Sequence, residues 1–189
     1  MIEYEKKVLL TEKEYLALME YFQDKQDSVL QINHYFDTDY FVMDRNGITC
    51  RIREKDGKFK AVMKKHRQTQ MYCSEETEMC IRDGLIENDF VTMGLFYQGK
   101  LQTFRTVVLE NDCCKIMLDR NEYLGIVDYE LEAEYPVEHE SRALQMVWKL
   151  LSMIDADDGT DVQDVESRMT SKAKNKSERF FERKRKMSD

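Results

Sequence analysis

The chain has 189 residues, of which 42% are hydrophobic and 35% are charged, and its formal net charge is −8. This length fits one domain, 1–189, and the apolar fraction is enough for a packed core, which excludes a disordered acidic chain. The negative charge argues against nucleic-acid binding, and no apolar run reaches the about 20 residues that a membrane span needs. Five cysteines without Cys-x-x-Cys spacing argue against a disulfide framework or a zinc site, so we expect a cytoplasmic protein.

The first ten residues alternate as a β-strand does. The two faces are a charged one, with Glu3, Glu5 and Lys7, and an apolar one, with Ile2, Tyr4, Val8, Leu10 and the exception Lys6. An ordinary half-buried strand with its charged row in water would show the same pattern. If other strands carry charged rows that can meet this one, the charged face is instead an interior.

A helix is predicted directly after this strand. Thr11 and Glu14 form a capping box, and the amphipathic pattern then extends to about Asp27. The predicted inward side chains are Tyr15, Leu18, Met19 and Phe22.

Four strands are predicted between residues 31 and 81. A β-prone stretch covers 31–40, and an Asn-Gly pair at 46–47 and an Asp-Gly pair at 56–57 are hairpin signals. Alternating residues place Arg51 and Arg53 on one face of the strand between these turns, and Lys60 and Lys64 lie on one face of the strand after them. A strand over 74–81 carries the acids Glu76 and Glu78 on one face.

The second half of the chain repeats this arrangement. We predict a helix over 86–98, a strand over 103–109 and another from 115, and an acidic strand over 128–135 that Pro136 ends. An amphipathic helix is predicted over 138–154, with Leu144, Val147, Trp148 and Leu151 inward. The basic tail, 172–189, is predicted to be helical and anchored by Phe180 and Phe181.

These elements predict an α+β protein with about eight strands. An eight-stranded antiparallel sheet can close on itself and so remove its edges, so we expect a closed barrel with flanking helices. The charged rows are acidic on the first, fourth and eighth strands and basic on the second, third, fifth and sixth. With helices covering the apolar faces from outside, the interior would be polar and lined by both signs of charge.

Such an interior suits a polyanion together with a divalent metal. Arginine and lysine neutralise phosphate oxygens, and arginine does so with a two-pronged fork. Carboxylates supply the hard oxygen ligands that Mg²⁺ or Mn²⁺ prefers.

The chain resembles the CYTH family, also called the triphosphate tunnel metalloenzymes, and in particular its short stand-alone bacterial members, which are often labelled adenylate cyclases. The resemblance covers essentially the whole chain. It rests on motifs in family order, namely Glu3-x-Glu5-x-Lys7, Tyr35-Phe-Asp-Thr38, Arg51-Ile-Arg53, Lys64, Glu76-Thr-Glu78, Arg105, Leu118-Asp119 and Glu130-Leu-Glu132-Ala-Glu134.

The resemblance implies roles for these residues. The metal ligands would be Glu3, Glu5, Glu130 and Glu132, with Glu134 as a further ligand or an orienting residue, and Lys7 would complete the catalytic set. The residues that line the tunnel and bind the substrate would be Lys7, Arg51, Arg53, Lys64, Glu78, Arg105 and Asp119. A lysine near the C-terminus would enter the tunnel mouth; we assign it to Lys176, with Lys172 and Lys174 as alternative registers.

The function expected from this resemblance is metal-dependent hydrolysis of a triphosphate, with Mg²⁺ or Mn²⁺ as cofactor. Inorganic tripolyphosphate is favoured over ATP or thiamine triphosphate, because no residue set in the sequence reads a base or a thiazolium ring. One alternative is a class IV-type adenylate cyclase that makes cyclic AMP and pyrophosphate. Another is a non-catalytic module that binds polyphosphate or nucleotide. No nucleic-acid or membrane partner is expected, and the chain would act as a monomer or homodimer.

Overall fold

The computed structural model describes the backbone of residues 2–22, 25–66, 73–79, 86–156 and 162–188, and the side chains of 4–22, 25–65, 89–154 and 164–187. Its elements are β1 (Ile2–Leu10), α1 (Glu12–Tyr21), β2 (Val29–Asp37), α2 (Val42–Arg45), β3 (Ile48–Lys55), β4 (Lys58–His66), β5 (Cys73–Met79), α3 (Ile86–Thr92), β6 (Phe96–Glu110), β7 (Lys115–Tyr123), β8 (Ile126–Tyr135), the 3₁₀ turn η1 (Val137–His139), α4 (Glu140–Ala156), α5 (Val162–Thr170) and α6 (Lys176–Ser188).

The strands form an antiparallel sheet, which confirms the α+β class. They pair in the order β1-β5-β4-β3-β2-β6-β7-β8, and β1 also pairs with β8, so the sheet closes into a barrel. The Asp56-Gly57 turn joins β3 to β4 directly, with φ angles of 51° and 70° that suit the predicted tight hairpin. The turn predicted at Asn46-Gly47 is different. There the short helix α2 lies between β2 and β3, and Gly47 ends that helix with a φ of 69°.

Two helix ends predicted from the sequence are wrong. The capping box of Thr11 and Glu14 is present, but α1 ends at Tyr21 rather than near Asp27, because the backbone N–H of Gln26 bonds to Val107 of β6. Helix α3 ends at Thr92, because Gly94 has a φ of 74° and the next residues pair with β2. The predicted strand end at 80–81 lies outside the described residues.

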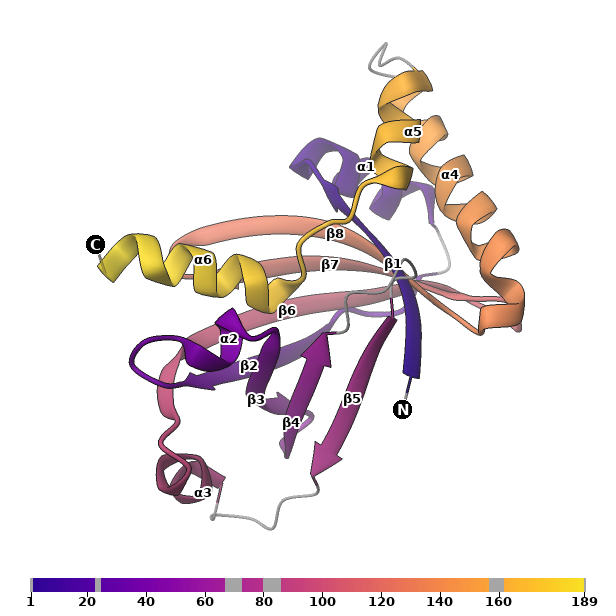
Figure 1. The fold of residues 1–189 in the computed structure, drawn as a ribbon. Helices are drawn as coiled ribbons and strands as arrows, with labels where there is room; N and C mark the ends of the chain where they lie inside the picture. Colours follow the sequence, from indigo (N-terminus) through magenta and orange to yellow (C-terminus); the bar gives the residue numbers. More distant parts are fainter. Residues whose placement is uncertain (1, 23–24, 67–72, 80–85, 157–161, 189) are drawn as a thin grey trace.

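The main apolar core lies outside the barrel, between its wall and three helices. Figure 1 shows α1, α4 and α5 gathered beside β1 and β8. The fully or largely buried side chains here include Leu18, Leu118, Leu131, Val147 and Leu151. Trp148, predicted to face inward, is 46% exposed, because the buried stripe of α4 runs through 143, 147, 150, 151 and 154 and leaves position 148 outside it.

A second, aromatic cluster fixes the C-terminal helix. Phe180 and Phe181 of α6 are buried against Tyr35, Leu101 and Tyr123, which confirms that they anchor the tail. The approach is close at Gly99, where a Cβ atom would lie 3.0 Å from the Phe180 ring. Helix α6 is thereby held along the β6–β8 side of the barrel (Figure 1). Within the described residues, no helix combines the length and the apolar character that crossing a membrane requires.

Candidate active site in the barrel cavity

The barrel encloses a cavity of about 80 Å³, which is space for several water molecules. Its lining comes from alternate positions of the strands, since successive strand side chains point to opposite faces. The lining residues are Glu5, Lys7, Gln31, Asn33, Thr49, Arg51, Arg53, Lys64, Thr103, Arg105, Glu132, Glu134, Asn175, Lys176 and Ser177. The charged face of β1 is therefore an interior, as the matching rows on the other strands predict.

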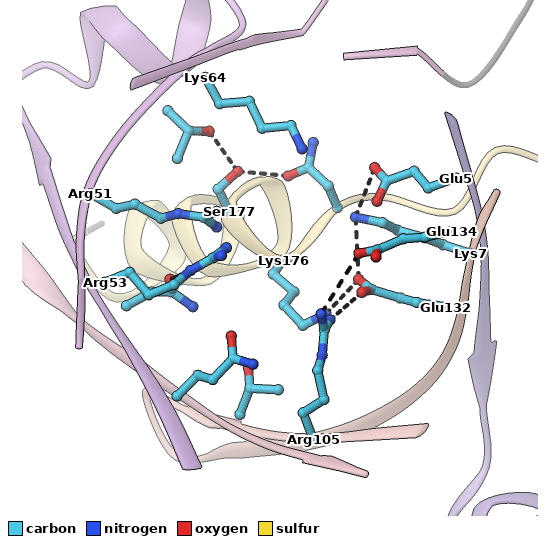
Figure 2. Close-up of a pocket in the computed structure, with 15 residues that line it drawn as sticks. Glu5, Lys7, Arg51, Arg53, Lys64, Arg105, Glu132, Glu134, Lys176 and Ser177 are labelled. Atoms are coloured by element: carbon cyan, nitrogen blue, oxygen red, sulfur yellow. Dashed lines mark hydrogen bonds and ion pairs between the residues drawn. The ribbon is translucent and has the colours of Figure 1, made fainter. Parts of the chain in front are cut away.

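The cavity has two walls of opposite chemistry. The acidic wall comes from β1, β7 and β8 and carries Glu5, Asp119, Glu130, Glu132 and Glu134. The basic wall comes from β3 and β4 and carries Arg51, Arg53 and Lys64. Figure 2 shows Arg51 and Arg53 pointing inward on one side, with Glu5, Glu132 and Glu134 on the other.

Lys176, the first residue of α6, reaches into the acidic wall. Its Nζ lies 2.8 Å from Asp119 Oδ2 and 2.7 Å from Glu132 Oε1, and it also contacts Glu130. The next residue, Ser177, bonds to Thr49 of β3 across 2.7 Å, so the first turn of α6 spans from one wall to the other.

Lys7 and Arg105 hold the acidic wall together from within. Lys7 Nζ lies 3.1 Å from Glu5 Oε1 and 3.3 Å from Glu132 Oε1. Arg105 binds Asp119 through two parallel hydrogen bonds of 2.9 and 2.6 Å and also contacts Glu132. This two-pronged pairing fixes the orientation of the carboxylates as well as their charge.

These contacts shift the pKa values of the ionisable side chains in the acidic wall. Burial would raise the pKa of Glu5, but Lys7 and Lys64 outweigh it, and the pKa is lowered. The pKa of Glu132 is likewise lowered against burial, by Arg105 and Lys7. Burial opposes the charge of Lys7, yet Glu132 and Glu5 raise its pKa above the usual value. The three groups are therefore all charged at neutral pH.

Exposure rises along β8 from one end of the cavity to the other. The side chain of Glu130 is 0% exposed, that of Glu132 is 4% and that of Glu134 is 40%. Solvent therefore reaches the acidic wall from the Glu134 end, while α6 covers the Glu130 end.

At the covered end, Arg179 of α6 orients Glu130. Its guanidinium donates to Glu130 Oε2 at 2.6 Å and to both carboxylate oxygens of Asp128, at 2.9 and 3.2 Å. Because Arg179 is itself buried, this pairing holds Glu130 in one position.

The acidic wall contains a set of carboxylates that fits a divalent cation. Among the described residues, Asp119, Glu130 and Glu132 each offer a ligand atom, all within 4.8 Å of one another. The Nζ atom of Lys176 already stands among these carboxylates. Burial lowers the pKa of Lys176 well below its usual value, with Arg105 and Lys7 adding to the shift and Asp119 opposing it. Carboxylate oxygens are the donors that Mg²⁺ and Mn²⁺ prefer, so the residues present suit the predicted metal.

The structure brings most of the predicted site residues together. Nine of them line the cavity, while Asp119 and Glu130 lie directly behind Lys176. The side chains of Glu3 and Glu78 lie outside the described residues, although their backbones pair within β1 and β5. The register of the C-terminal lysine is Lys176, since Lys174 pairs with Glu182 on the outside of α6.

Several cavity residues carry no full charge and were missed in the sequence. Gln31 and Asn33 of β2 and Thr49 and Thr103 of β3 and β6 lie between the charged walls. Strand parity was the signal for Thr49 and Thr103, which lie two positions from the predicted inward residues Arg51 and Arg105. No inward residue was predicted on β2, so Gln31 and Asn33 had no such signal. Arg179 was also missed, although its spacing of three from Lys176 places both on one face of a helix.

Comparison with known proteins identifies the family that the sequence motifs resemble. The sequence model of the CYTH domain family matches residues 1–181. A Bacillus subtilis protein named "Putative triphosphatase YjbK" is 33% identical over 199 residues, covering 98% of this chain and 97% of that protein.

Solved structures are similar over most of the chain. A "putative adenylate cyclase" from Bacillus halodurans has a TM-score of 0.68 at 25% identity, covering 95% of this chain and 97% of that one. A Hippeastrum protein, HpAC1, described as a "putative adenylyl cyclase" with a dominant triphosphatase activity, has a TM-score of 0.58 at 20% identity. That match covers 82% of this chain and 87% of HpAC1, and at this identity it supports the fold alone.

Proposed function

Because this chain belongs to the CYTH family, we propose that it hydrolyses a triphosphate with Mg²⁺ or Mn²⁺, and that inorganic tripolyphosphate is its substrate. The observation that carries the proposal is the pairing, across one cavity, of a buried carboxylate cluster with a wall of arginine and lysine. An anion-binding module alone would gain nothing from so many carboxylates, since each repels phosphate.

In this proposal the acidic wall holds the cation. Asp119, Glu130 and Glu132 would be its ligands, with Glu5 beside them. The bound metal would neutralise charge on the phosphate oxygens and lower the pKa of an attacking water. Lys176 would leave its place among the carboxylates and turn its ammonium to the substrate.

The basic wall binds the phosphates. Arg51 and Arg53 present guanidinium groups that can grip phosphate oxygens with two bonds, and Lys64 adds a point charge. Fixed positive charges aimed at the transferring phosphoryl group are the largest contribution in this type of reaction.

The cavity favours water as the nucleophile. Of the described lining residues none is cysteine or histidine, and the hydroxyls of Thr49, Thr103 and Ser177 are each bonded to another side chain. Lys7 and Arg105 hold carboxylate oxygens of Glu5 and Asp119 in ion pairs, which suits these groups to an electrostatic role.

The lining of the cavity supports a small inorganic substrate. Its fifteen described lining residues include no aromatic side chain on which a base or a thiazolium ring could stack. Inorganic tripolyphosphate needs no further pocket.

A substrate panel tests the proposal. Tripolyphosphate, thiamine triphosphate and ATP are each incubated with the protein and Mg²⁺ or Mn²⁺, and orthophosphate, pyrophosphate and cyclic AMP are measured. We expect orthophosphate, released fastest from tripolyphosphate and only with metal. Cyclic AMP as the main product from ATP would replace the proposal with the cyclase, and binding of tripolyphosphate without turnover would replace it with a binding module.

A further inference from the structure

Lys6 is the one charged residue on the outward, apolar face of β1, and it is fully buried. Its Nζ donates to the backbone carbonyls of Met169 at 2.7 Å, Ser171 at 3.0 Å and Arg168 at 3.2 Å. An ammonium has three N–H donors, so these three acceptors match its full donor set.

The carbonyls belong to the end of α5. The last carbonyls of a helix have no partner within the helix and carry the negative end of its dipole, so a cation there is favourable. Lys6 lies more than 160 positions away in the sequence, and the contact therefore ties the first strand to the C-terminal part of the chain. Burial lowers the pKa of Lys6, which is the cost that the three carbonyls offset.

The segment that follows is the strap, residues 171–175, which joins α5 to α6. It has no regular secondary structure, and Lys176 begins the helix directly after it. Five residues span at most about 17 Å, so the position of Ser171 limits where Lys176 can lie. Lys6 holds the first residue of this strap, through the carbonyl of Ser171.

A second anchor acts before the strap rather than on it. Arg168 donates to Glu14 of α1 at 2.6 Å and to the carbonyl of Leu9 at 3.0 Å. These two contacts of Arg168 fix the last turns of α5. Lys6 binds the same turns and also reaches the carbonyl of Ser171. The two anchors can therefore be separated by experiment.

Lys6 also lies between two cavity residues. Its neighbours Glu5 and Lys7 point into the barrel and pair there, and Lys7 pairs with Glu132. Glu132 in turn contacts Lys176 at 2.7 Å. Two neighbouring residues of β1 are therefore linked to Lys176: Lys7 through Glu132 inside the barrel, and Lys6 through the strap outside it.

We propose that Lys6 is a positioning residue: by holding the carbonyls of Arg168, Met169 and Ser171, it sets the start of the strap and so the depth at which Lys176 enters the cavity. This inference rests on the proposed function, in which Lys176 binds the substrate.

The test is a double-mutant cycle with tripolyphosphate and Mg²⁺. Lys6→Met, Lys176→Met and the double variant are compared with wild type, and Lys172→Met serves as a matched control, since Lys172 is an exposed lysine of the strap. We expect Lys6→Met to lower kcat/KM roughly 10- to 100-fold, because a small misplacement of Lys176 is enough for such a loss. In the Lys176→Met background, Lys6→Met should cause no further decrease in kcat/KM. Lys172→Met should match wild type.

The opposite outcomes overturn the inference. If Lys6→Met retains wild-type kcat/KM, or if its loss multiplies with that of Lys176→Met, Lys6 does not act through Lys176. If Lys6→Met does not fold, insertion of two glycines after Lys172 keeps the Lys6 contacts and relaxes the strap. That insertion should lower kcat/KM to the level of Lys6→Met; a fully active insertion variant contradicts the inference.

The two proposals fail separately. If wild type does not hydrolyse tripolyphosphate, the proposed function fails, and the same cycle is measured as tripolyphosphate affinity by calorimetry. The positioning role is supported if Lys6→Met binds tripolyphosphate more weakly than wild type while the double variant binds it as well as Lys176→Met does. Equal affinity in Lys6→Met and wild type rejects the role.

Discussion

The two walls of the cavity differ in the sign of their charged side chains. On the acidic wall, Asp119, Glu130 and Glu132 are almost completely buried. Lys7 and Arg105 compensate their charge, and the Nζ atom of Lys176 lies among them. The basic wall faces them with Arg51, Arg53 and Lys64, and neutral amide and hydroxyl groups lie between (Figure 2). The three buried carboxylates offer oxygen ligands to a metal cation, whereas the guanidinium groups of Arg51 and Arg53 offer N–H donors to an anion.

The largest expected effect is on the acidic wall. Glu130→Gln keeps the shape of the side chain but removes a buried ligand charge, so we expect metal-dependent phosphate release to fall by roughly 1000-fold or more. Glu5→Gln should have an effect in the same direction. The measurement is orthophosphate release from tripolyphosphate, with circular dichroism to verify folding.

The matched control is Glu122→Gln on the outer face of β7, where Glu122 pairs with Arg120. It should retain wild-type turnover. Full activity in both Glu130→Gln and Glu5→Gln would refute the assignment of this wall.

A smaller effect is expected on the basic wall. Arg51→Lys keeps the positive charge but loses the fork that grips two oxygens, so KM for tripolyphosphate should rise about 10- to 100-fold with a smaller change in kcat. Steady-state kinetics measures both values. Arg120→Lys, on the outside of the barrel, is the control, and an unchanged KM in Arg51→Lys would show that this wall does not bind phosphate.

The smallest effect is on stability in acid, without metal. The folded-state pKa values of Glu5 and Glu132 are lowered, so their ion pairs stabilise the fold above the ordinary value of 4.5, and this stability is lost as pH falls through the folded values. The free energy of unfolding, from urea titrations, should therefore decrease below about pH 4.5. Glu5→Gln should reduce that decrease and Arg51→Lys should not; the same pH slope in all three proteins would contradict the account.

The sequence predicts the acidic wall better than its surroundings. Glu5 and Lys7 share a strand face with period two, so their meeting with Glu132 follows once the sheet closes. Lys6 on the opposite face could only be seen as an exception, because its partners are backbone carbonyls more than 160 residues away. Contacts of this kind depend on the backbone path and leave no pattern in the chain.

The helix ends show the same limit. Local capping predicts the start of α1 at Thr11 correctly, but its end depends on the bond from Gln26 to β6. Trp148 fits an amphipathic stripe by spacing, yet the neighbouring helices cover only the adjacent face of α4. In both cases the tertiary contacts override a local preference.

The central claim is that the acidic wall binds the metal and the basic wall binds the phosphates. It is tested most directly by Mn²⁺ binding, measured by calorimetry without substrate in wild type, Glu130→Gln and Arg51→Lys. We expect Mn²⁺ to bind saturably to wild type and to Arg51→Lys, and binding to be lost in Glu130→Gln. Equal Mn²⁺ affinity in Glu130→Gln and wild type, or its loss in Arg51→Lys, would contradict it.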